Sequence, residues 1–384
     1  MKEGKSKFGK IRAPRRGPEG RLWFVADLDG PINGQLIANC RMLSLLETSA
    51  TMTVLPLGAS GWRKILAALK LTGAAMASEP QDRLYLSLPG QRGGWLLLAS
   101  LILFRLRGAN LFLHHHSYRN MRAGPTWLGC ALARAAGPRA VHILLSQAMA
   151  AAYAKRYLRP GAARPVTLSN AALLPPPAPP GKRHGPLAIG FLGAWTKEKG
   201  VDHVLAVVER LLQDDSTLRF TLAGAPPVKD DPIIETITAM AARWPDRFSV
   251  QGWLDGAEKS TFFDRLDCLL LPSSLPDEAE PLTMLEAFSA GVEVMATPIG
   301  AIPERIRSPD CLLSLDIETD CTRIVRLVAR RRADRDASTR ECREHAVRLH
   351  SAGLPARDAL LARLTETSEA ISSHRISITG SQIS

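Results

Sequence analysis

The chain has 384 residues, of which 46% are hydrophobic and 22% charged, so it is long enough for two domains that each bury a core. Its six cysteines are scattered without any Cys-x-x-Cys pair, which excludes a disulfide framework or a zinc ribbon and favours free thiols in a reducing compartment. The formal net charge is +12, but the basic stretches lack interleaved aromatic residues, which argues against nucleic acid as a partner.

Positive charge gathers at the two ends of the chain. Residues 1–21 hold eight Lys and Arg residues against Glu3 and Glu19, and we expect residues 1–20 to form a disordered basic tail. This tail lacks the apolar core of a signal peptide, so we expect a cytoplasmic protein. Arginine also crowds residues 323–363. Such basic surfaces favour polyanions, and we expect peripheral contact with the inner, anionic face of a membrane.

Short apolar segments alternate with longer helical patterns from residue 21 onward. Residues 22–26 read as a buried strand that ends at Asp27, and residues 34–46 carry apolar side chains at helical spacing. Further strands are expected at 51–55, 109–113 and 140–145. This alternation is typical of a parallel sheet covered by helices, and it predicts an N-terminal Rossmann-like domain over 21–172.

One apolar run in this half has two interpretations. Residues 95–104 are ten consecutive residues of largely apolar character, well short of the roughly 20 that a membrane-spanning helix needs. We favour a buried helix that packs on the sheet. The alternative is a segment that dips into the membrane surface.

The same rhythm restarts after a proline-rich segment. Residues 173–185 predict a semi-rigid linker, and residues 186–333 predict a second Rossmann-like domain. We expect C-terminal helices over 334–367 that cross back to the first domain, and a frayed tail over 368–384. The predicted fold class is therefore α/β, with two doubly wound domains facing a central cleft. Ligands of such sheets bind at the carboxyl ends of the strands.

Two carboxylates stand out in the second domain. Glu278 lies in a loop after the strand at 268–271, and Glu286 lies about two turns into the helix that follows. A carboxylate accepts hydrogen bonds from vicinal hydroxyls, which suits recognition of ribose and hexose. The alternative is a pair of solvated glutamates favoured by the helix dipole.

The segment 272–304 resembles the donor-binding region of the retaining glycosyltransferases of family 4, a GT-B group that uses nucleotide-sugars. The residues that match its pattern are Pro272, Ser273, Glu278, Glu286, Ala287, Gly291, Thr297, Gly300, Pro303 and Glu304. The family usually has an aromatic residue two positions after the first glutamate, where this chain has Glu280. This departure concerns the local loop geometry and the preference for the donor sugar.

Residues 189–211 resemble the first strand, loop and helix of the same donor domain. Gly193 occupies the glycine position of the loop, and Lys199 with Gly200 match the pair that opens the helix. A glycine-rich turn into a helix N-terminus offers amides to a phosphate, and Lys199 adds a cation for the departing diphosphate. Many members carry an arginine directly after the glycine, where this chain has Ala194.

The N-terminal half matches the family more loosely. The loop around Asn33 and Gly34 corresponds to its glycine-rich loop, and Asn170 resembles an asparagine at a strand end. Three histidines, residues 114–116, follow the strand at 109–113. Because strand side chains alternate, His114 and His116 should point one way and His115 the other. The family has a strand-end histidine followed by Ser or Thr, so His116 is the best match and His115 the second. One or two of the three also fit a purely structural role.

A competing motif lies at Asp27–Asp29. A buried strand followed by Asp-x-Asp-Gly resembles the nucleophile motif of haloacid-dehalogenase-like phosphatases, in which Asp27 would be the nucleophile and Asp29 the acid/base, with magnesium. That family usually has Thr where this chain has Pro31. A third hypothesis is a non-catalytic relative that binds nucleotide or glycan, motivated by Ala194 and Glu280.

The glycosyltransferase resemblance implies a specific set of roles. It implies transfer of a sugar, with retention, from a nucleotide-sugar to a glycan, lipid-linked or other hydroxyl acceptor, in cell-surface polysaccharide or glycolipid synthesis. No cofactor and no metal are expected. His116 and Glu278 are the expected catalytic residues. The expected donor-binding residues are Gly34, Gly193, Lys199, Glu278, Ala279, Pro281, Leu282 and Glu286.

Overall fold

The computed structural model describes residues 20–30, 33–48, 52–58, 61–90, 92–177, 183 and 185–365. Most of the predicted basic tail, the predicted frayed tail from 368 on, and part of the proline-rich segment lie outside these residues. The chain divides into two compact units. Unit 1 comprises residues up to Leu173 together with those from Gly353 on, and unit 2 runs from Leu174 to Ala352.

Unit 1 is built on a six-stranded parallel sheet in the order β2-β1-β3-β4-β5-β6. The strands are β1 (Leu22–Ala26), β2 (Met52–Pro56), β3 (Arg83–Leu88), β4 (Asn110–His115), β5 (Val141–Leu144) and β6 (Val166–Thr167). The helical segments are α1 (Gly34–Glu47), α2 (Gly61–Met76), η1 (Arg92–Leu97), α3 (Leu98–Leu106), α4 (Arg119–Arg122), α5 (Trp127–Ala136), α6 (Gln147–Tyr157) and η2 (Asn170–Ala172).

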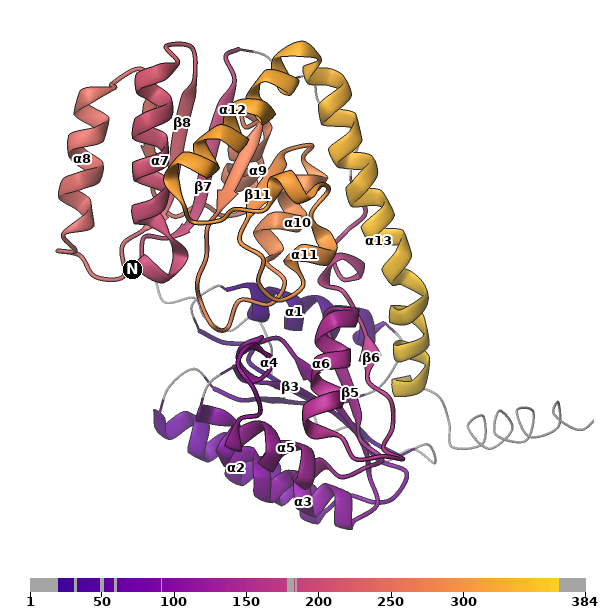
Figure 1. Ribbon diagram of the computed structural model, residues 1–384. Helices are drawn as coiled ribbons and strands as arrows, with labels where there is room; N and C mark the ends of the chain where they lie inside the picture. The colour runs from indigo at the N-terminus through magenta and orange to yellow at the C-terminus, as the bar shows by residue number, and fades with distance from the viewer. Residues whose placement is uncertain are drawn as a thin grey trace, which may run out of the picture. The chain divides into compact units, whose positions relative to one another are not determined.

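Alternation along β1 divides the core of unit 1 between the two faces of the sheet. Leu22 and Phe24 join a cluster with α1, whereas Trp23 and Val25 join a cluster with α2, α3 and α5. Figure 1 shows α2, α3 and α5 lying together along unit 1. The sequence analysis did not predict β3, which is completely buried in the middle of the sheet. Its first residue is the charged Arg83, so no apolar run marks where the strand begins.

The apolar run at 95–104 is the second difference from the sequence-based expectation. It forms part of η1 and α3, and Leu97, Leu101 and Phe104 pack on the sheet as expected for a buried helix. The prediction of a buried helix is nevertheless wrong for the outer face, because Trp95 and Ile102 are exposed. A helix that lies on one face of a sheet buries only one side, and here the other side is apolar as well.

Unit 2 has a five-stranded parallel sheet in the order β11-β10-β7-β8-β9. The strands are β7 (Ala188–Ala194), β8 (Arg219–Ala225), β9 (Phe248–Gln251), β10 (Cys268–Leu271) and β11 (Glu293–Ala296). The helical segments are η3 (Lys197–Lys199), α7 (Val201–Asp214), α8 (Ile233–Arg243), α9 (Gly256–Asp264), α10 (Leu282–Ser289), α11 (Ile302–Arg305), η4 (Pro309–Cys311), α12 (Ile317–Ala333) and α13 (Arg335–Thr365). Two parallel-sheet α/β domains confirm the predicted class of fold.

The C-terminal segment is one continuous helix, α13, rather than several. Its first turns belong to unit 2, and its last turns, with Leu360 and Leu364, belong to the core of unit 1. At its start, Arg335 donates to both carboxylate oxygens of Asp267 at 2.7 Å. No helix among the described residues is both long and apolar enough to cross a bilayer.

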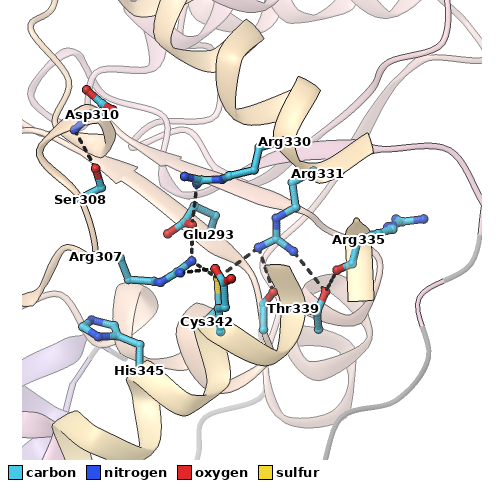
Figure 2. Close-up of polar contacts among 12 residues, drawn as sticks. Glu293, Arg307, Ser308, Asp310, Arg330, Arg331, Arg335, Thr339, Cys342 and His345 are labelled. Atoms are coloured by element: carbon cyan, nitrogen blue, oxygen red, sulfur yellow. Dashed lines mark hydrogen bonds and ion pairs between the residues drawn. The ribbon is translucent and has the colours of Figure 1, made fainter. Parts of the chain in front are cut away.

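A buried polar cluster fastens α13 to unit 2 (Figure 2). Glu293 accepts from Arg307 at 2.6 Å and from Arg330 at 3.2 Å. The fully buried Arg331 donates to the Thr339 hydroxyl and to the Gly291 carbonyl, both at 3.1 Å. Because these donors and acceptors come from β11, α12 and α13, their pairing fixes the position of the helix start on the sheet.

Candidate functional site

The topology of unit 2 points to the edge of the sheet where a ligand should bind. The chain runs from β7 outward through β8 and β9, then returns to the other side of β7 with β10 and β11. The strand order therefore reverses between β7 and β10. In open parallel sheets, the crevice outside such a switch point is where ligands bind. The two loops that flank it are 195–200, after β7, and 272–281, after β10.

These two loops are joined by hydrogen bonds and close backbone contacts. The Ser274 amide donates to the Glu198 carbonyl at 2.7 Å. Gly200 has φ +77°, and a Cβ there would lie 2.2 Å from the Pro272 carbonyl oxygen, so only glycine fits. Gly224, after β8, is under the same constraint, because its Cβ would lie 1.8 Å from the Gly193 oxygen. The glycines thus allow the strand-end loops to approach one another.

Lys199 and Glu278, two of the predicted residues, meet at the switch point. Lys199 ends η3, whose first turn is capped by the Thr196 hydroxyl, which accepts from the Lys199 amide at 3.3 Å. The Lys199 Nζ donates to Glu278 Oε2 at 2.5 Å, and both side chains are only partly exposed. The pair places a cation and a carboxylate side by side where a phosphate and a sugar hydroxyl would need them.

Glu286, the second predicted carboxylate, forms its own ion pair. It lies in α10, and its Oε2 is 2.5 Å from Nζ of Lys259 in α9. The sequence analysis did not find Lys259, because nothing in the exposed, polar α9 segment distinguishes this lysine from a solvated one. Two partly exposed Lys–Glu pairs therefore lie in unit 2, on the segments that resemble a donor-binding region.

The loop between the two carboxylates is held from the side of β11. The Ala301 amide donates to the Ala279 carbonyl at 2.7 Å, and Gly300 (φ +60°) permits this approach, since its Cβ would lie 2.3 Å from the same oxygen. Pro281 has no N–H, so it offers no backbone donor to a ligand. It directly precedes α10, where Leu282 and Thr283 are the first helical residues, and amides in the first turn of a helix lack intrahelical acceptors.

Glu280, the residue that departs from the family pattern, is a buried partner of Arg305. The Arg305 Nε donates to Glu280 Oε1 at 2.5 Å, and the Glu280 side chain is completely inaccessible. Burial lowers the pKa of His345, so the ring is neutral and its Nε2–H donates to the Arg305 carbonyl at 2.6 Å. The charged residue in place of the aromatic one is thus neutralised inside unit 2, and it holds the donor loop to α11.

Gly193 and Ala194 end β7 beside these loops. A Cβ at Gly193 would meet only the Phe191 ring, at 3.4 Å, so the glycine leaves space above the strand end rather than relieving a contact. Ala194 carries no donor beyond its backbone, so the arginine contact of the resembling family is not available from this position. The cation nearest in the chain that meets a predicted carboxylate is Lys199.

In unit 1 the histidines follow the predicted alternation. The rings of His114 and His116 lie 4.0 Å apart, whereas His115 pairs with His142, Nε2 to Nδ1, at 3.0 Å. The Tyr85 hydroxyl is 2.6 Å from His114 Nδ1. His114 and His115 are buried in the sheet, which supports a structural role for these two.

His116 differs from its two neighbours because it lies just beyond the end of β4 and is half-buried. Burial of the ring lowers the pKa of His116 to about 4, so its imidazole is neutral near pH 7. Its Nε2 has no hydrogen-bond partner among the residues that the structure describes. A neutral ring with one unpaired nitrogen suits a hydrogen bond to a hydroxyl better than binding of a phosphate.

The glycine-rich loop of unit 1 lies at that unit's own switch point, between β1 and β3. Asn33 caps α1 by accepting from the Leu36 amide at 2.9 Å, and Gly34 is the exposed first residue of the helix. Gln35 donates to the Leu88 carbonyl at 3.0 Å and so connects the two strand ends. Asn170, also predicted, is buried in η2.

The residues of the competing phosphatase motif are separated between the units. Asp27 ends β1 in unit 1, where burial raises the pKa of its carboxyl, whereas the Lys229–Asp231 segment that would complete the motif belongs to unit 2. Within the described residues there is no group of three or more His, Cys, Asp or Glu side chains placed to hold a metal ion.

Comparisons with known proteins agree with this geometry. Residues 186–330, most of unit 2, match the sequence model of the family described as Glycosyl transferases group 1. A glycogen synthase from Alkalilimnicola ehrlichii is 28% identical over 142 residues, which cover 37% of this chain and 26% of that protein. The chain therefore spans about a quarter of the length of the curated relative that it matches.

Solved structures resemble nearly the whole chain. HepE from Anabaena in complex with UDP-glucose aligns with a TM-score of 0.62 at 14% identity, over 92% of this chain and 100% of HepE. TarM aligns with a TM-score of 0.61 at 14% identity, over 79% of this chain and 58% of TarM. An E. coli protein bound with UDP-2-fluoro glucose aligns with a TM-score of 0.61 at 11% identity, over 90% and 99% of the two chains. At such identities the likeness shows the fold, which is GT-B.

Proposed function

We propose that this chain is a retaining glycosyltransferase that moves a hexose from a nucleotide-sugar to a hydroxyl acceptor. The observation that supports it best is the meeting of Lys199 and Glu278 at the switch point of a unit that matches a glycosyltransferase family. Without a donor, the two side chains satisfy each other. With a donor bound, a diphosphate takes over Lys199, and sugar hydroxyls take over Glu278.

The second ion pair supports a place for the nucleoside. Glu286 accepts the ribose hydroxyls in this proposal, and its distance of 2.5 Å to Lys259 shows that a partner already holds the carboxylate ready to accept hydrogen bonds. The backbone around Gly193 and Gly34 is proposed to approach the diphosphate. The amides of Ala279 and Leu282 are proposed to bind the sugar, and Pro281 shapes the loop without donating a hydrogen bond.

The chemistry needs no nucleophilic side chain. The bond between the anomeric carbon and the diphosphate oxygen breaks, the acceptor oxygen attacks from the same face, and its proton passes to the leaving diphosphate. Catalysis then consists of positioning and of stabilising the charge on the leaving group, which Lys199 supplies. His116, neutral and with an unpaired Nε2, is proposed to hydrogen-bond the sugar beside the reacting carbon.

The acceptor is proposed from the chemistry of the chain rather than from a bound ligand. A net charge of +12 favours an acceptor carried on an anionic surface, such as a lipid-linked or surface polysaccharide. We accordingly propose a cytoplasmic protein with peripheral contact at the inner membrane face, active in polysaccharide or glycolipid synthesis. HepE and TarM, which share the fold, were crystallised with UDP-glucose and, for TarM of S. aureus, with UDP and alpha-GlcNAc-glycerol.

Thermal unfolding with a panel of nucleotide-sugars tests the donor site. A donor present at about 100 times its Kd should stabilise the folded chain by roughly 2.7 kcal/mol and raise the Tm by several degrees. The Glu286→Gln variant should lose most of this shift, because a neutral amide accepts the ribose hydrogen bonds more weakly. Glu344→Gln, which removes an exposed carboxylate from α13, is the matched control and should keep the shift.

The outcomes separate the three hypotheses. A shift with one donor, together with transfer to an acceptor, supports the transferase. Binding without any turnover supports a non-catalytic relative. Magnesium-dependent hydrolysis of a phosphate ester that needs Asp27 and persists in Glu286→Gln supports the phosphatase. A panel in which no nucleotide-sugar shifts the Tm contradicts the proposal.

A further inference from the structure

The outer side of α2 is apolar along its whole length. Trp62, Ile65, Leu66, Leu69 and Met76 are between 43% and 66% exposed. Their spacing of three, four and seven residues places them on one side of the helix, opposite the buried Leu71 and Ala75. An amphipathic surface helix would carry polar residues on this side. In α2 the helix buries one apolar stripe and presents another to solvent.

The neighbouring segments extend this exposed stripe. Trp95, Leu96, Ile102 and Leu106, in η1 and α3, are 39–70% exposed, and Trp127 at the start of α5 is 88% exposed. The Thr72 and Ser100 hydroxyls, 2.9 Å apart, join α2 to α3, and Gly94 lies against Leu128 of α5, so these elements are adjacent (Figure 1). We call the exposed residues of α2, η1, α3 and Trp127 the apolar face.

This concentration is specific to one part of the chain. Of the 17 large hydrophobic residues exposed in the described part of the chain, ten belong to the apolar face, and the remaining seven are spread over unit 2. Single exposed hydrophobic residues need no explanation, but a contiguous patch of this kind marks an interaction site. Three of the ten are tryptophans, the side chain that is enriched where a bilayer meets water.

The charge around the apolar face is almost purely positive. Between Thr48 and Leu173 the chain has fifteen Lys and Arg residues and only two acidic ones, Glu79 and Asp82. Asp82 is completely buried, where it accepts from the Arg21 amide at 2.8 Å. The helices α2, α3 and α5 contain no acidic residue. Arg63 and Lys70 follow the exposed stripe of α2 along one border, and the Arg63 guanidinium lies 5.7 Å from the Trp62 ring centroid.

Charge decides which partner fits this surface. A second copy of the chain would bring an equally basic rim against this one, which opposes self-association. An anionic bilayer accepts both components, because apolar side chains enter the acyl boundary while Arg and Lys extend their charged ends to the head groups. Each basic residue near such a surface adds to the binding, and the absence of acidic residues means that no repulsion offsets it.

We propose that the apolar face of unit 1 is a membrane-docking surface that inserts the side chains of α2, η1 and α3 into the head-group region of an anionic bilayer. The proposal deepens the proposed function by naming the surface that would make the peripheral contact. It rests on exposure and charge within unit 1, and docking is measured without any sugar donor. Failure of the docking proposal is therefore distinguishable from failure of the transferase proposal.

Co-sedimentation of the full chain with vesicles tests this surface. We expect binding to phosphatidylcholine vesicles that contain about a third phosphatidylglycerol, weaker binding to pure phosphatidylcholine, and loss of binding as salt rises. Leu69→Glu should lower the partition coefficient roughly tenfold or more, because it replaces an inserted apolar side chain by a charge of the wrong sign. Val325→Glu, at an exposed position of α12 in unit 2, is the matched control and should bind as the unchanged chain does.

Circular dichroism and the Tm of both variants establish that each remains folded, as expected for changes at exposed positions. Equal loss of binding in Leu69→Glu and Val325→Glu overturns the proposal, because general charge and the basic N-terminal tail would then account for binding. Absence of binding to either vesicle also overturns it. Dimerisation of the chain in solution that Leu69→Glu abolishes would assign the apolar face to a second copy instead.

Discussion

Unit 1 and unit 2 share a parallel α/β architecture but differ in the side chains at the carboxyl ends of their strands. Unit 2 presents charged pairs, Lys199 with Glu278 and, on neighbouring helices, Lys259 with Glu286. Unit 1 presents uncharged histidines, whose pKa values are lowered by burial. The same sheet geometry therefore offers two chemistries. One unit is suited to a diphosphate and vicinal hydroxyls, and the other to a neutral hydrogen bond.

The two units also differ in how they treat charge in their interiors. Unit 2 buries complete ion pairs, such as Glu280 with Arg305 and Glu293 with Arg307, and each carboxylate has a guanidinium partner. Unit 1 instead buries titratable rings in the neutral state, and its basic residues lie around an exposed apolar face. Unit 2 should therefore be sensitive to removal of one partner, whereas unit 1 should be sensitive to acid.

The largest expected effect comes from breaking a buried pair in unit 2. Glu280→Ala leaves the Arg305 guanidinium, with a side chain that is 11% exposed, without its carboxylate. Removal of one partner from a buried pair costs about 3–5 kcal/mol, which urea denaturation would measure as a lower unfolding free energy. Asp214→Asn breaks an exposed pair with Arg210 in the same unit and should cost about 0.5 kcal/mol or less. Equal losses in the two variants would mean that the buried pair has no special importance.

The next effect concerns the charge at the donor site. Lys199→Met should lower kcat/KM for transfer by about 10²–10³-fold, because it removes the cation that stabilises the leaving diphosphate. His116→Ala in unit 1 removes only a neutral hydrogen bond and should lower kcat/KM by about tenfold. Steady-state kinetics with the donor found by thermal shift measures both. A larger loss for His116→Ala than for Lys199→Met would reverse the division of chemistry between the units.

Acid should act mainly on unit 1. Burial lowers the pKa of both His116 and His142 to about 4, below the ordinary value of 6.5. Between these values the unfolded chain binds more protons than the folded one, so stability is fully present above about pH 6.5 and falls as the pH drops toward 4. Each of these histidines should remove about 2 kcal/mol by pH 5.

Urea denaturation at a series of pH values measures this loss. His116→Gln, which cannot titrate, should lose less stability between about pH 7 and pH 5 than the unchanged chain does. If the two proteins show the same pH dependence, protonation of His116 does not contribute, and the acid sensitivity lies elsewhere in the molecule.

Sequence reasoning found the residues whose positions follow from local pattern. Glu278, Glu286, Lys199 and the glycines lie where a strand, a loop and a helix follow one another closely, so chain order already places them near strand ends. The alternation of His114, His115 and His116 followed in the same way from the pleat of a strand, and the ring contacts agree with it.

Other residues escaped prediction because their partners are distant in the chain. Lys259 meets Glu286 from another helix, and Arg305 meets Glu280 across 25 residues, so neither pair has a local signal. β3 was missed because a central strand is recognised by the strands on both sides of it. The outer face of α3 was wrongly assigned to the core, because an apolar run does not reveal how many of its sides a sheet can cover.

The sequence by itself thus determined the alternating α/β architecture, the strand-end placement of the glycines and carboxylates, and the excess of positive charge. These depend on interactions between residues that are close along the chain. Only the tertiary structure decided that Glu280 is a neutralised buried anion and that the tryptophans at 62, 95 and 127 remain exposed. Both facts depend on packing, because burial and ion pairing are properties of a residue's neighbours in space.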